Sequence, residues 1–577
     1  MRADLAASVR AWIADDPDPS TRAELEALLE AGNEAELADR FAGRLEFGTA
    51  GLRGVLGGGP NRMNRAVVIA ATAGLCDHLA TSGLRARGLV IAYDGRRLSR
   101  EFAEEAARVA AGRGIVAHLF SHLAPTPLAA FAVGALGVGA GVMITASHNP
   151  PEYNGYKAYW DNGAQIIPPT DVAIAAAIKR VGSIARVPRP ALAAARTAGL
   201  VVDVPPRVQA AYLDAIAGLV RPGPGRDALG IVYTAMHGVG GALVQQALAR
   251  AGFRKLHLVA EQFEPDGAFP TVAFPNPEEP GALDLSLALA EKTSADIVLA
   301  NDPDADRLAV AARRKDGTFA ALSGNEIGAL LAGHTVEGAP DPARALAITT
   351  IVSSPFLGAM CERLGVRYEE TLTGFKWIAN RAMALFASEG LEFRFGYEEA
   401  LGYTVGTIVR DKDGVGSALV LADLAAREKA AGRTLWERLD QLYRRYGYYA
   451  SGAKNITHKG QDGAQRIAAT MEALRATPPE RVGASAVRAM TDVDRGVRLR
   501  PGGASEPITL PRSNVIAFAL ADGSRITVRP SGTEPKIKFY FDVREEVLGD
   551  EPMAAARARA AGRLGELERA FMALVRD

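Results

Sequence analysis

The chain has 577 residues, of which 48% are hydrophobic, enough for several separately packed cores. Lysine plus arginine (66) balances aspartate plus glutamate (66), so no net charge recruits nucleic acid or a membrane surface. Attraction of an anionic substrate must therefore be built locally. The only cysteines, Cys76 and Cys361, are too few for a disulfide framework, and no signal-peptide core is present. We therefore expect a cytoplasmic protein.

Short Val/Ile/Leu runs alternate with alanine-rich stretches over most of the chain, a pattern typical of sheets covered by helices. The first module has a predicted strand at 89–93, a helix at 99–112 capped by Ser99, and a strand at 115–120. The second has strands at 230–233, 256–259 and 297–300, with a helix after Gly240. The third has strands at 345–351 and 393–395, with a helix after Pro355. Three similar mixed α/β domains are predicted.

One uncharged stretch, 128–146, is long enough to be weighed as a membrane span. Glycines at 134, 137, 139 and 141 interrupt it, so we interpret it as a short helix, a turn and a buried strand. The C-terminal part differs, with closely spaced strands at 515–520, 526–528 and 536–543, and a long helix from about Pro552. The predicted fold class is α/β, with three similar domains followed by a C-terminal α+β domain.

Residues Thr145-Ala146-Ser147-His148-Asn149-Pro150 directly follow the apolar run 141–144. A strand therefore presents a serine and a histidine in a turn stiffened by proline, as a nucleophile is presented. Asp302, Asp304 and Asp306 follow the strand-like run 297–300 at alternate positions, as ligands of a hard cation do. Together they indicate phosphate chemistry with magnesium.

Further loops carry candidate phosphate and sugar ligands. The segment 529–536 offers the Arg529 guanidinium, the Ser531 and Thr533 hydroxyls and the Gly532 backbone, which can surround a phosphate. An earlier glycine-rich loop, 46–54, contains Arg53. In the third module, Thr373-Gly374-Phe375-Lys376 and the adjacent Glu398 and Glu399 follow predicted strands, where binding loops of open α/β sheets lie.

Several alternatives to this interpretation exist. The aspartates do not form an EF-hand, since Arg307 and Arg313 occupy the positions that require glycine and glutamate; a solvated acidic turn stays open. An aspartyl-phosphate enzyme would use Asp302 as nucleophile, but Asp306 stands where threonine or valine is usual. No ATP-binding P-loop occurs, and Ser147 lacks the glycines of a hydrolase elbow. A non-catalytic sugar-phosphate binding protein is the remaining alternative.

Four motifs in one order resemble the α-D-phosphohexomutase family: Gly48-Thr49-Ala50-Gly51-Leu52-Arg53, Thr145–Pro150, Asp302-x-Asp304-x-Asp306-Arg307 and Arg529–Thr533. The chain is most similar to its phosphoglucomutase and phosphopentomutase branch, through Gly374-Phe375-Lys376-Trp377 and Tyr397-Glu398-Glu399-Ala400. The resemblance implies four domains around a central cleft. We expect a helical addition (1–40), domain I with the phosphoserine loop (41–205), domain II with the metal loop (206–318), domain III with the sugar loop (319–445) and domain IV with the phosphate loop (446–577).

The resemblance also implies roles for individual residues. Ser147 is the phosphoserine, and its phosphate holds Mg²⁺ together with Asp302, Asp304 and Asp306. Arg53, His148 and Lys157 lie near the transferring phosphoryl group, and either His148 or Lys157 handles the hydroxyl proton. Substrate contacts are expected from Arg307, Thr373, Gly374, Lys376, Glu398, Glu399, Lys412, Arg529, Ser531, Gly532 and Thr533. Many relatives have serine where this chain has Ala400, so one sugar hydrogen bond is missing.

The implied reaction moves phosphate between the 1 and 6 positions of a hexose, glucose being favoured, through a sugar bisphosphate. Glucose 1,6-bisphosphate, or the matching sugar bisphosphate, is the expected activator. A phosphopentomutase or phosphomannomutase is the alternative. The expected partner is a small sugar phosphate, without nucleic acid or membrane, and the expected assembly is a monomer or small homo-oligomer. Each phosphate carries about −1.5 to −2 at pH 7, so basic side chains must supplement the metal.

Overall fold

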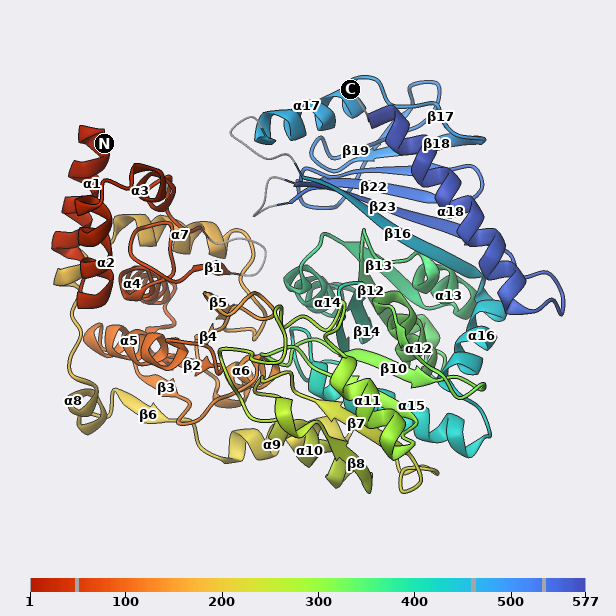
Figure 1. Cartoon of the computed structure of the whole chain (residues 1–577), viewed down its shortest axis with the longest axis horizontal. Helices are drawn as coiled ribbons and strands as arrows, with labels where there is room; N and C mark the ends of the chain where they lie inside the picture. The colour runs from red at the N-terminus through yellow and green to blue at the C-terminus, as the bar shows by residue number, and fades with distance from the viewer. Residues whose placement is uncertain (1, 47–50, 458–462, 532–535, 576–577) are drawn as a thin grey trace. The chain divides into compact units, whose positions relative to one another are not determined.

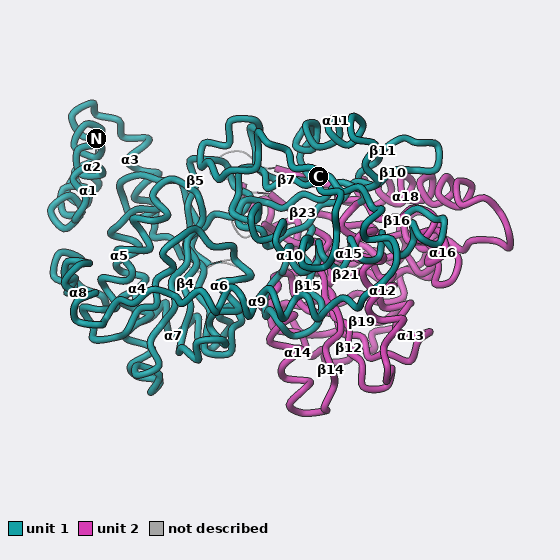
Figure 2. Tube along the Cα trace, turned by 90° about the horizontal axis from the view of Figure 1, so that it is seen from below, with its two compact units in different colours: residues 1–322, 401–434 teal, residues 323–400, 435–577 magenta. Residues whose placement is uncertain are grey.

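The computed structural model describes residues 2–46, 51–457, 463–531 and 536–575. The chain divides into two compact units (Figure 2). Unit 1 comprises Met1–Leu322 and Leu401–Thr434, and unit 2 comprises Ser323–Ala400 and Leu435–Asp577. Among the described residues, no helix is long and apolar enough to cross a membrane.

Unit 1 begins with three helices, α1 (Ala3–Asp15), α2 (Pro19–Glu30) and α3 (Glu34–Arg40). They share a small core that includes Leu5, Val9, Leu25 and Leu37. Side chains cap the second and third helices, because Asp18 accepts a hydrogen bond from the Ser20 backbone and Asn33 from that of Glu36. The helices therefore form a small packed module of their own.

The first sheet of unit 1 has six strands in the order β1-β5-β4-β2-β3-β6. Strands β6, β3, β2 and β4 are parallel, and β5 runs antiparallel to both β4 and β1. The strands are β1 (Leu52–Val55), β2 (Leu89–Tyr93), β3 (Ala117–Leu119), β4 (Ala140–Ile144), β5 (Tyr153–Trp160) and β6 (Val201–Asp203). The helices are α4 (Arg65–Thr81), α5 (Ser99–Gly112), α6 (Thr126–Leu136), α7 (Thr170–Arg180) and α8 (Leu192–Thr197), with the short turns η1 (Arg85–Arg87) and η2 (Ile184–Arg186).

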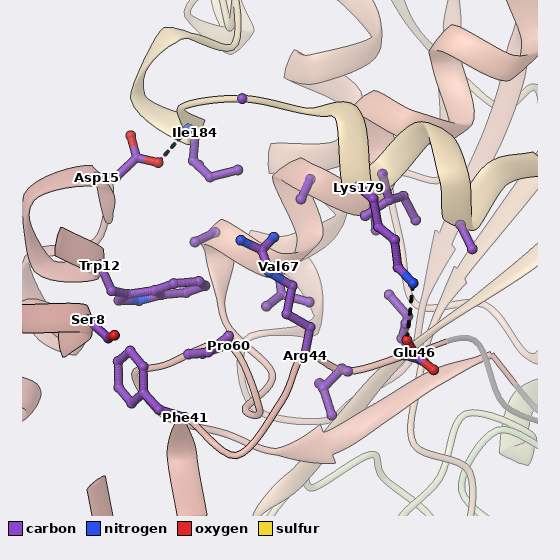
Figure 3. A pocket seen from close by; sticks show the side chains of 18 of the residues that line it. Ser8, Trp12, Asp15, Phe41, Arg44, Glu46, Pro60, Val67, Lys179 and Ile184 are labelled. Atoms are coloured by element: carbon purple, nitrogen blue, oxygen red, sulfur yellow. Dashed lines mark hydrogen bonds and ion pairs between the residues drawn. The ribbon is translucent and has the colours of Figure 1, made fainter. Parts of the chain in front are cut away.

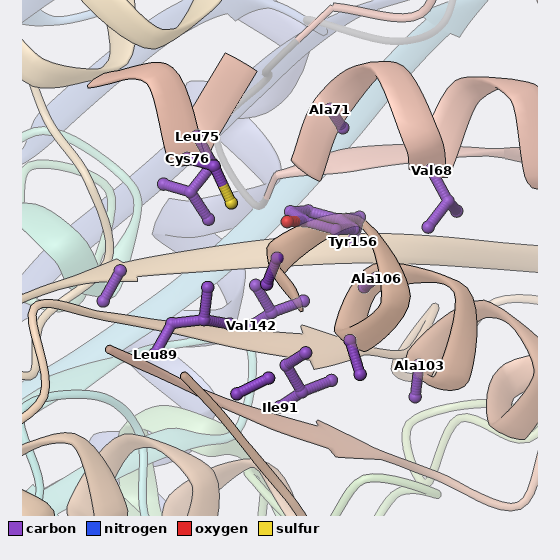
Figure 4. Packing of buried hydrophobic residues seen from close by; sticks show 14 of the residues in the cluster. Val68, Ala71, Leu75, Cys76, Leu89, Ile91, Ala103, Ala106, Val142 and Tyr156 are labelled. Carbon is purple, nitrogen blue, oxygen red and sulfur yellow. The ribbon is translucent and has the colours of Figure 1, made fainter. Parts of the chain in front are cut away.

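The core of this domain lies between the sheet and helices α4 and α5 (Figure 4). Leu75 and Cys76 of α4 and Ala106 of α5 pack with Ile91 and Tyr156 of the sheet. The uncharged stretch 128–146 contributes α6 and β4, as predicted. The predicted cap of α5 is wrong, because Leu98 precedes the helix in a left-handed conformation and Ser99 instead donates to Asp94 Oδ1 at 2.6 Å.

The second sheet of unit 1 has the order β11-β10-β9-β7-β8, with β8, β7 and β9 parallel and the others antiparallel. Its strands are β7 (Gly230–Thr234), β8 (Lys255–Leu258), β9 (Ile297–Ala300), β10 (Ala309–Arg313) and β11 (Phe319–Leu322). Helices α9 (Arg207–Ala217), α10 (Gly241–Arg250) and α11 (Asp284–Thr293) and the turn η3 (Ala260–Gln262) accompany it. The later segment of unit 1, Leu401–Thr434, contains β15 (Gly402–Val405), which is not a strand of this sheet, and α15 (Gly414–Ala430), which packs against α10.

Unit 2 contains the third α/β domain, in which β12 lies between β13 and β14 and is parallel to both. The strands are β12 (Ala345–Thr350), β13 (Arg367–Thr371) and β14 (Glu392–Glu398). The helices are α12 (Gly324–Thr335), α13 (Phe356–Leu364), α14 (Phe375–Glu389) and α16 (Leu435–Tyr446), with the turn η4 (Pro342–Arg344). A capping box formed by Ser323 and Glu326 begins α12.

The rest of unit 2 is an antiparallel sheet in the order β16-β23-β22-β21-β18-β19-β20, with β17 beside β18. Helix α18 lies along one face of it (Figure 1), and its Phe571 contacts Phe518, Phe539 and Phe541. The strands are β16 (Tyr448–Thr457), β17 (Arg481–Val482), β18 (Ser485–Asp492), β19 (Val497–Leu499), β20 (Ser505–Pro507), β21 (Ile516–Leu520), β22 (Arg525–Pro530) and β23 (Lys536–Glu545), and the helices are α17 (Gly463–Ala476) and α18 (Met553–Val575). The predicted fold class, three α/β domains and a C-terminal α+β domain, is confirmed.

Candidate active site

Ser147 lies in the turn that follows the fully buried strand β4, and only 3% of its surface is exposed. Its backbone has a φ of 52°, a left-handed conformation that is costly for a residue with a side chain. The turn is held locally, because the Ser147 amide donates to the Thr145 hydroxyl at 2.8 Å. A strained backbone at the end of a rigid strand fixes the direction of the serine side chain.

The buried guanidinium of Arg96 binds the backbone of the same turn. It donates to the carbonyl oxygens of Ser147 (2.7 Å), Pro150 (2.8 Å) and Tyr153 (3.1 Å), and also to that of Asn149. Four backbone carbonyls between Ser147 and Tyr153 therefore converge on one side chain, a geometry that the planar guanidinium of arginine allows.

Two groups orient Arg96 in turn. Its Nε lies 3.6 Å from the carboxylate of Asp94, and its guanidinium stacks over the Phe269 ring, 4.9 Å from the ring centre. Phe269 belongs to the second domain. Residues of both domains therefore support the serine loop, because Phe269 contacts Arg96 and Arg96 binds the loop.

The three aspartates follow β9 in a tight turn in which Ala305 has a φ of 55°. All three are completely buried, and their ligand atoms lie within 4.8 Å of one another. The Ser147 hydroxyl donates to Asp302 Oδ2 at 2.8 Å, although 155 positions separate the two residues. The predicted nucleophile and the predicted metal ligands therefore form one cluster.

Cations surround this cluster. Lys157 on β5 contacts Asp304 Oδ2 at 2.7 Å and Asp306 Oδ2 at 2.8 Å. Lys412 lies 3.0 Å from Asp306 Oδ2, and Arg307 Nε lies 3.9 Å from Asp302 Oδ2. In addition, the Thr126 hydroxyl donates to Asp304 Oδ2 at 2.6 Å.

The arrangement separates the proton affinities of the three carboxyl groups. Burial raises the pKa of Asp302 well above its ordinary value, and the charges of Asp304 and Asp306 raise it further. Burial also acts on the other two, but the Lys157 ammonium outweighs it and lowers the pKa of Asp304 and of Asp306. Asp302 therefore binds a proton more tightly than the other two carboxyl groups of the cluster do.

The donor set fits a hard divalent cation. Among the residues that the structure describes, no donor hydrogen-bonds the buried oxygens Asp304 Oδ1 or Asp306 Oδ1. A buried carboxylate oxygen without a donor is costly. Carboxylate oxygens are the ligands that hard divalent cations such as Mg²⁺ and Ca²⁺ take in proteins.

His148 and Arg53 lie beside the serine. His148 Nδ1 is 3.3 Å from Ser147 Oγ. Burial lowers the pKa of His148 well below its ordinary value, and the positive charges of Arg307 and Arg53 act in the same direction, so the ring is neutral at pH 7. Arg53 on β1 donates to Asn149 Oδ1 at 2.9 Å, and burial lowers its pKa to about 10. All four predicted catalytic residues therefore lie in one region of unit 1.

Asp411 lies in the segment Leu401–Thr434 of unit 1 and connects the backbone at Lys412 to β5 and the residues that follow it. Its carboxylate accepts hydrogen bonds from Tyr159 at 2.8 Å and Gln165 at 2.7 Å, and from the Lys412 backbone at 2.8 Å. Lys412 was predicted from the sequence, and its buried neighbour Asp411 was not. Asp411 therefore fixes the position from which Lys412 contacts Asp306.

The predicted sugar loops lie in unit 2. Glu398, at the end of β14, accepts a hydrogen bond from the Gly374 backbone at 2.7 Å, which joins the two loops that carry Thr373, Lys376 and Glu398. Glu399 contacts the Ser353 hydroxyl at 3.1 Å and that of Thr350 at 3.4 Å. Glu399 is therefore held by the protein's own hydroxyl groups.

The predicted phosphate loop lies between β22 and β23, where Arg529 is part of the strand and the Ser531 amide donates to the Lys536 carbonyl at 2.7 Å. Gly532 and Thr533 fall outside the described residues. Near the start of β22, Arg525 donates to Glu370 at 2.8 Å and to Asp542 at 3.0 Å, and it also reaches the Ser353 carbonyl. Arg525 therefore links β22 to the segment that holds Glu399.

Sequence reasoning missed several of these supporting residues, namely Arg96, Thr126, Tyr159, Gln165, Asp411, Ser353 and Arg525. Only Arg96 had a sequence signal, because it follows β2 directly in the turn Asp94-Gly95-Arg96. A polar turn at the carboxyl end of a parallel strand is a usual place for functional residues. The others reach the site through tertiary contacts.

Comparison with known proteins shows the family of this chain. Four family models match in succession: Phosphoglucomutase/phosphomannomutase alpha/beta/alpha domain I over residues 44–184, domain II over 210–317, domain III over 323–446 and the C-terminal domain over 468–557. The chain therefore belongs to the phosphoglucomutase/phosphomannomutase family, the α-D-phosphohexomutases. It is an enzyme of the mutase class.

Individual relatives carry different substrate names. Phosphopentomutase from Homo sapiens is 38% identical over 556 residues, covering 92% of this chain and 90% of the relative. Probable phosphomannomutase from Haemophilus influenzae is 40% identical over 504 residues, covering 86% and 96%. Glucose 1,6-bisphosphate synthase from Mus musculus is 37% identical over 552 residues, covering 92% and 89%. The crystal structure of a putative phosphomannomutase from Thermus thermophilus has the same fold, with a TM-score of 0.65 at 22% identity, covering 91% of this chain and 99% of that one.

Proposed function

We propose that the protein is a phosphoglucomutase-type enzyme that interconverts hexose 1-phosphate and 6-phosphate, with glucose as the favoured sugar, through a phosphoserine at position 147. The observation that carries this proposal is the 2.8 Å contact between Ser147 Oγ and Asp302 Oδ2 inside a buried cluster of three carboxylates. A buried hydroxyl beside a hard-cation site is suited to carrying a phosphoryl group.

In the proposed reaction, the bond between Ser147 Oγ and phosphorus breaks while a bond forms between phosphorus and the free hydroxyl of a sugar monophosphate. The hydroxyl proton passes to a base, Ser147 Oγ takes up a proton as it leaves phosphorus, and a serine hydroxyl and a sugar bisphosphate result. After the bisphosphate turns around, its other phosphate returns to Ser147. Glucose 1,6-bisphosphate, or the matching bisphosphate of another sugar, is then the activator that loads the serine.

Mg²⁺ would be held by Asp302, Asp304, Asp306 and the Ser147 phosphate, where it would neutralise charge on the phosphoryl oxygens. Lys157, Lys412, Arg307 and Arg53 add positive charge around the same position, which favours a loose phosphoryl transfer. We assign the proton transfer to His148. Its Nδ1 is 3.3 Å from Ser147 Oγ, whereas the Lys157 ammonium is held by two carboxylates.

The sugar would be recognised by unit 2. We propose that Glu398 and Lys376, with Thr373 and Gly374, contact the sugar hydroxyls, and that Arg529, Ser531, Gly532 and Thr533 bind the phosphate that does not react. Glu399 supports this loop through Ser353 and Thr350. Phosphopentomutase or phosphomannomutase activity is the second candidate. The names of the relatives favour it, and so does Ala400, where a serine would give one more sugar hydrogen bond.

We also propose the domain division 1–40, 41–205, 206–318, 319–445 and 446–577, and a cytoplasmic monomer or small homo-oligomer. Cys76 and Cys361 are both buried free thiols, which supports a reducing compartment.

The decisive experiment is phosphopeptide mapping after brief incubation with glucose 1,6-bisphosphate that carries radioactive phosphorus. We expect acid-stable label on the peptide that contains Ser147. Label on the peptide of Asp302, or no label in an active preparation, would reject the proposal. Side-by-side kinetics with the 1-phosphates of glucose, mannose, ribose and deoxyribose then ranks the sugars, and a pentose with the highest kcat/KM would replace glucose in the proposal.

A further inference from the structure

A cavity of about 370 Å³ lies within unit 1 where the N-terminal helices meet the first α/β domain (Figure 3). Helix α1, the segment 41–46 and helices α4 and α7 form its walls. It shares no lining residue with the serine loop or the aspartate loop. Its volume falls in the range of pockets that bind small molecules.

The walls are apolar, aromatic and held in place. Trp12 and Phe41 meet edge to face, with 6.3 Å between ring centres and an interplanar angle of 86°. The Trp12 indole donates to Asp16 Oδ2 at 3.2 Å, which fixes the ring. Val67 and Ala70 of α4 form part of the opposite wall. The cavity therefore presents a preformed aromatic surface that a planar ligand can cover.

Two cations, Arg44 and Lys179, and two carboxylates, Asp15 and Glu46, line the cavity, and they differ in their partners. The guanidinium of Arg44 extends into the cavity between Trp12 and Lys179 (Figure 3), and no described residue accepts a hydrogen bond or forms an ion pair with it. The carboxylates nearby are already engaged. Asp15 accepts from the Ile184 backbone at 2.7 Å and from that of Ala185 at 3.1 Å, and Glu46 pairs with Lys179 at 3.5 Å. Arg44, an exposed residue at the rim, is therefore the lining cation for which the described residues provide no partner.

We propose that this cavity binds a small, planar aromatic monoanion, whose ring packs on Trp12 and Phe41 and whose carboxylate or sulfonate meets Arg44. A cation beside an aromatic wall selects such a molecule over a neutral one of the same shape. A sugar phosphate is a poorer match, since most of the lining side chains are apolar.

Strand β1 connects the cavity to Arg53 of the candidate active site. Leu45 and Leu52 both line the cavity, and Leu52 immediately precedes Arg53 on β1. In the pairing of β1 with β5, Leu52 lies opposite Tyr156 and Arg53 opposite Gly155. A ligand that contacts Leu52 therefore contacts the strand that presents Arg53, and we expect binding to change kcat. This part rests on the function proposed above.

The test uses two probes of one shape on the full-length enzyme: 8-anilinonaphthalene-1-sulfonate, an aromatic monoanion, and N-phenyl-1-naphthylamine, which lacks the sulfonate. Fluorescence titration of the wild type should show one molar equivalent of the sulfonate bound, undisturbed by saturating glucose 6-phosphate. Arg44→Gln should raise the Kd of the sulfonate about three- to tenfold. The Kd of the neutral probe should stay within about twofold of the wild-type value. Arg10→Gln, which removes an exposed arginine of α1 outside the cavity, is the matched control.

Equal sulfonate affinity in wild type and Arg44→Gln, or displacement by glucose 6-phosphate, would overturn the binding site. A second variant, Ala70→Leu, fills the cavity and should weaken both probes; unchanged affinity in a folded Ala70→Leu protein would also overturn it. An unchanged kcat at saturating sulfonate would overturn only the connection to Arg53. Because the fluorescence titration does not depend on turnover, the site can be tested even if the proposed function fails.

Discussion

Ser147 and Asp302 come from different domains, yet the serine hydroxyl donates to the aspartate carboxylate at 2.8 Å. Each residue follows a buried strand, β4 or β9, so each position is set by a rigid sheet. The contact also depends on how the two sheets of unit 1 pack. Thr126 strengthens that packing, because it donates from its side chain to Asp304 Oδ2 and from its backbone to the Asp304 carbonyl.

Removing the Ser147 hydroxyl should abolish turnover while leaving the fold intact. We expect Ser147→Ala to lower kcat by roughly 10³-fold or more, because loss of a nucleophile removes the covalent step. Binding of glucose 1-phosphate, measured by calorimetry, should change little. Ser121→Ala, at an exposed serine of the same domain, is the control. Near-normal kcat in Ser147→Ala would favour a non-catalytic binding protein or a different nucleophile.

Removing divalent cations should stop the reaction reversibly. We expect treatment with EDTA to lower kcat by at least about 100-fold, and added Mg²⁺ to restore it, because the buried carboxylates would otherwise leave the phosphoryl charge uncompensated. Asp304→Asn should raise the Mg²⁺ concentration needed for half-maximal rate. Asp316→Asn, in an exposed turn, should behave as wild type. Full activity after exhaustive chelation would contradict the metal assignment.

Loss of the Arg96 fork should affect catalysis more than substrate binding. Its guanidinium donates to four carbonyls of the serine loop, so Arg96→Lys, which keeps one charge but not the fork, should lower kcat about 10- to 100-fold with KM within about threefold. Arg100→Lys, on the exposed face of α5, is the matched control.

Guanidinium ion added to Arg96→Ala should restore part of the lost rate if the residue positions the loop. Parallel loss of kcat and of thermal stability, with no rescue, would instead indicate a purely structural role.

The protonation equilibrium of Asp413 should make the folded protein less stable as the pH rises. Burial raises the pKa of Asp413 to about 6, so the folded state holds this proton more tightly than the unfolded state does. The resulting stabilisation is complete when the pH is below the pKa of Asp413 in the unfolded chain, which is near 3.8. It is lost as the pH rises through about 6. Its contribution to the free energy of unfolding is at most roughly 3 kcal/mol.

Urea unfolding at several pH values between 4 and 7 measures this effect. Wild type should lose stability with rising pH relative to Asp413→Asn, whose amide oxygen still accepts from the Tyr212 hydroxyl and the Gly416 amide. A constant difference between the two proteins would contradict the prediction.

Ala400 should influence the choice of sugar. We expect Ala400→Ser to raise the ratio of kcat/KM for glucose 1-phosphate over ribose 1-phosphate by about three- to tenfold, because a hydroxyl there adds one hydrogen bond to the sugar. Ala384→Ser, a substitution of the same kind within α14, is the control. An unchanged ratio would mean that Ala400 does not face the sugar.

The local sequence determined most of the secondary structure and the identity of the chemical groups. The runs at 89–93, 297–300 and 516–520 are apolar and bounded by turn residues, so each became a strand. The serine, aspartate and phosphate motifs are short and contiguous, and their resemblance to a family could be recognised without a structure. Ser99 shows the limit of local reasoning. Its predicted cap failed because the buried Asp94 competes for the hydroxyl.

Only the tertiary structure decided which side chains support the site. Arg96 acts on backbone carbonyls, which carry no side-chain signature in the sequence. Asp411 reaches Tyr159 across 252 positions, because the chain leaves unit 1 and returns to it. Such contacts depend on how separately formed sheets pack against each other, and that packing is specified by many side chains at once. For the same reason, the cavity at Arg44 could be found only after the N-terminal helices were placed against the first domain.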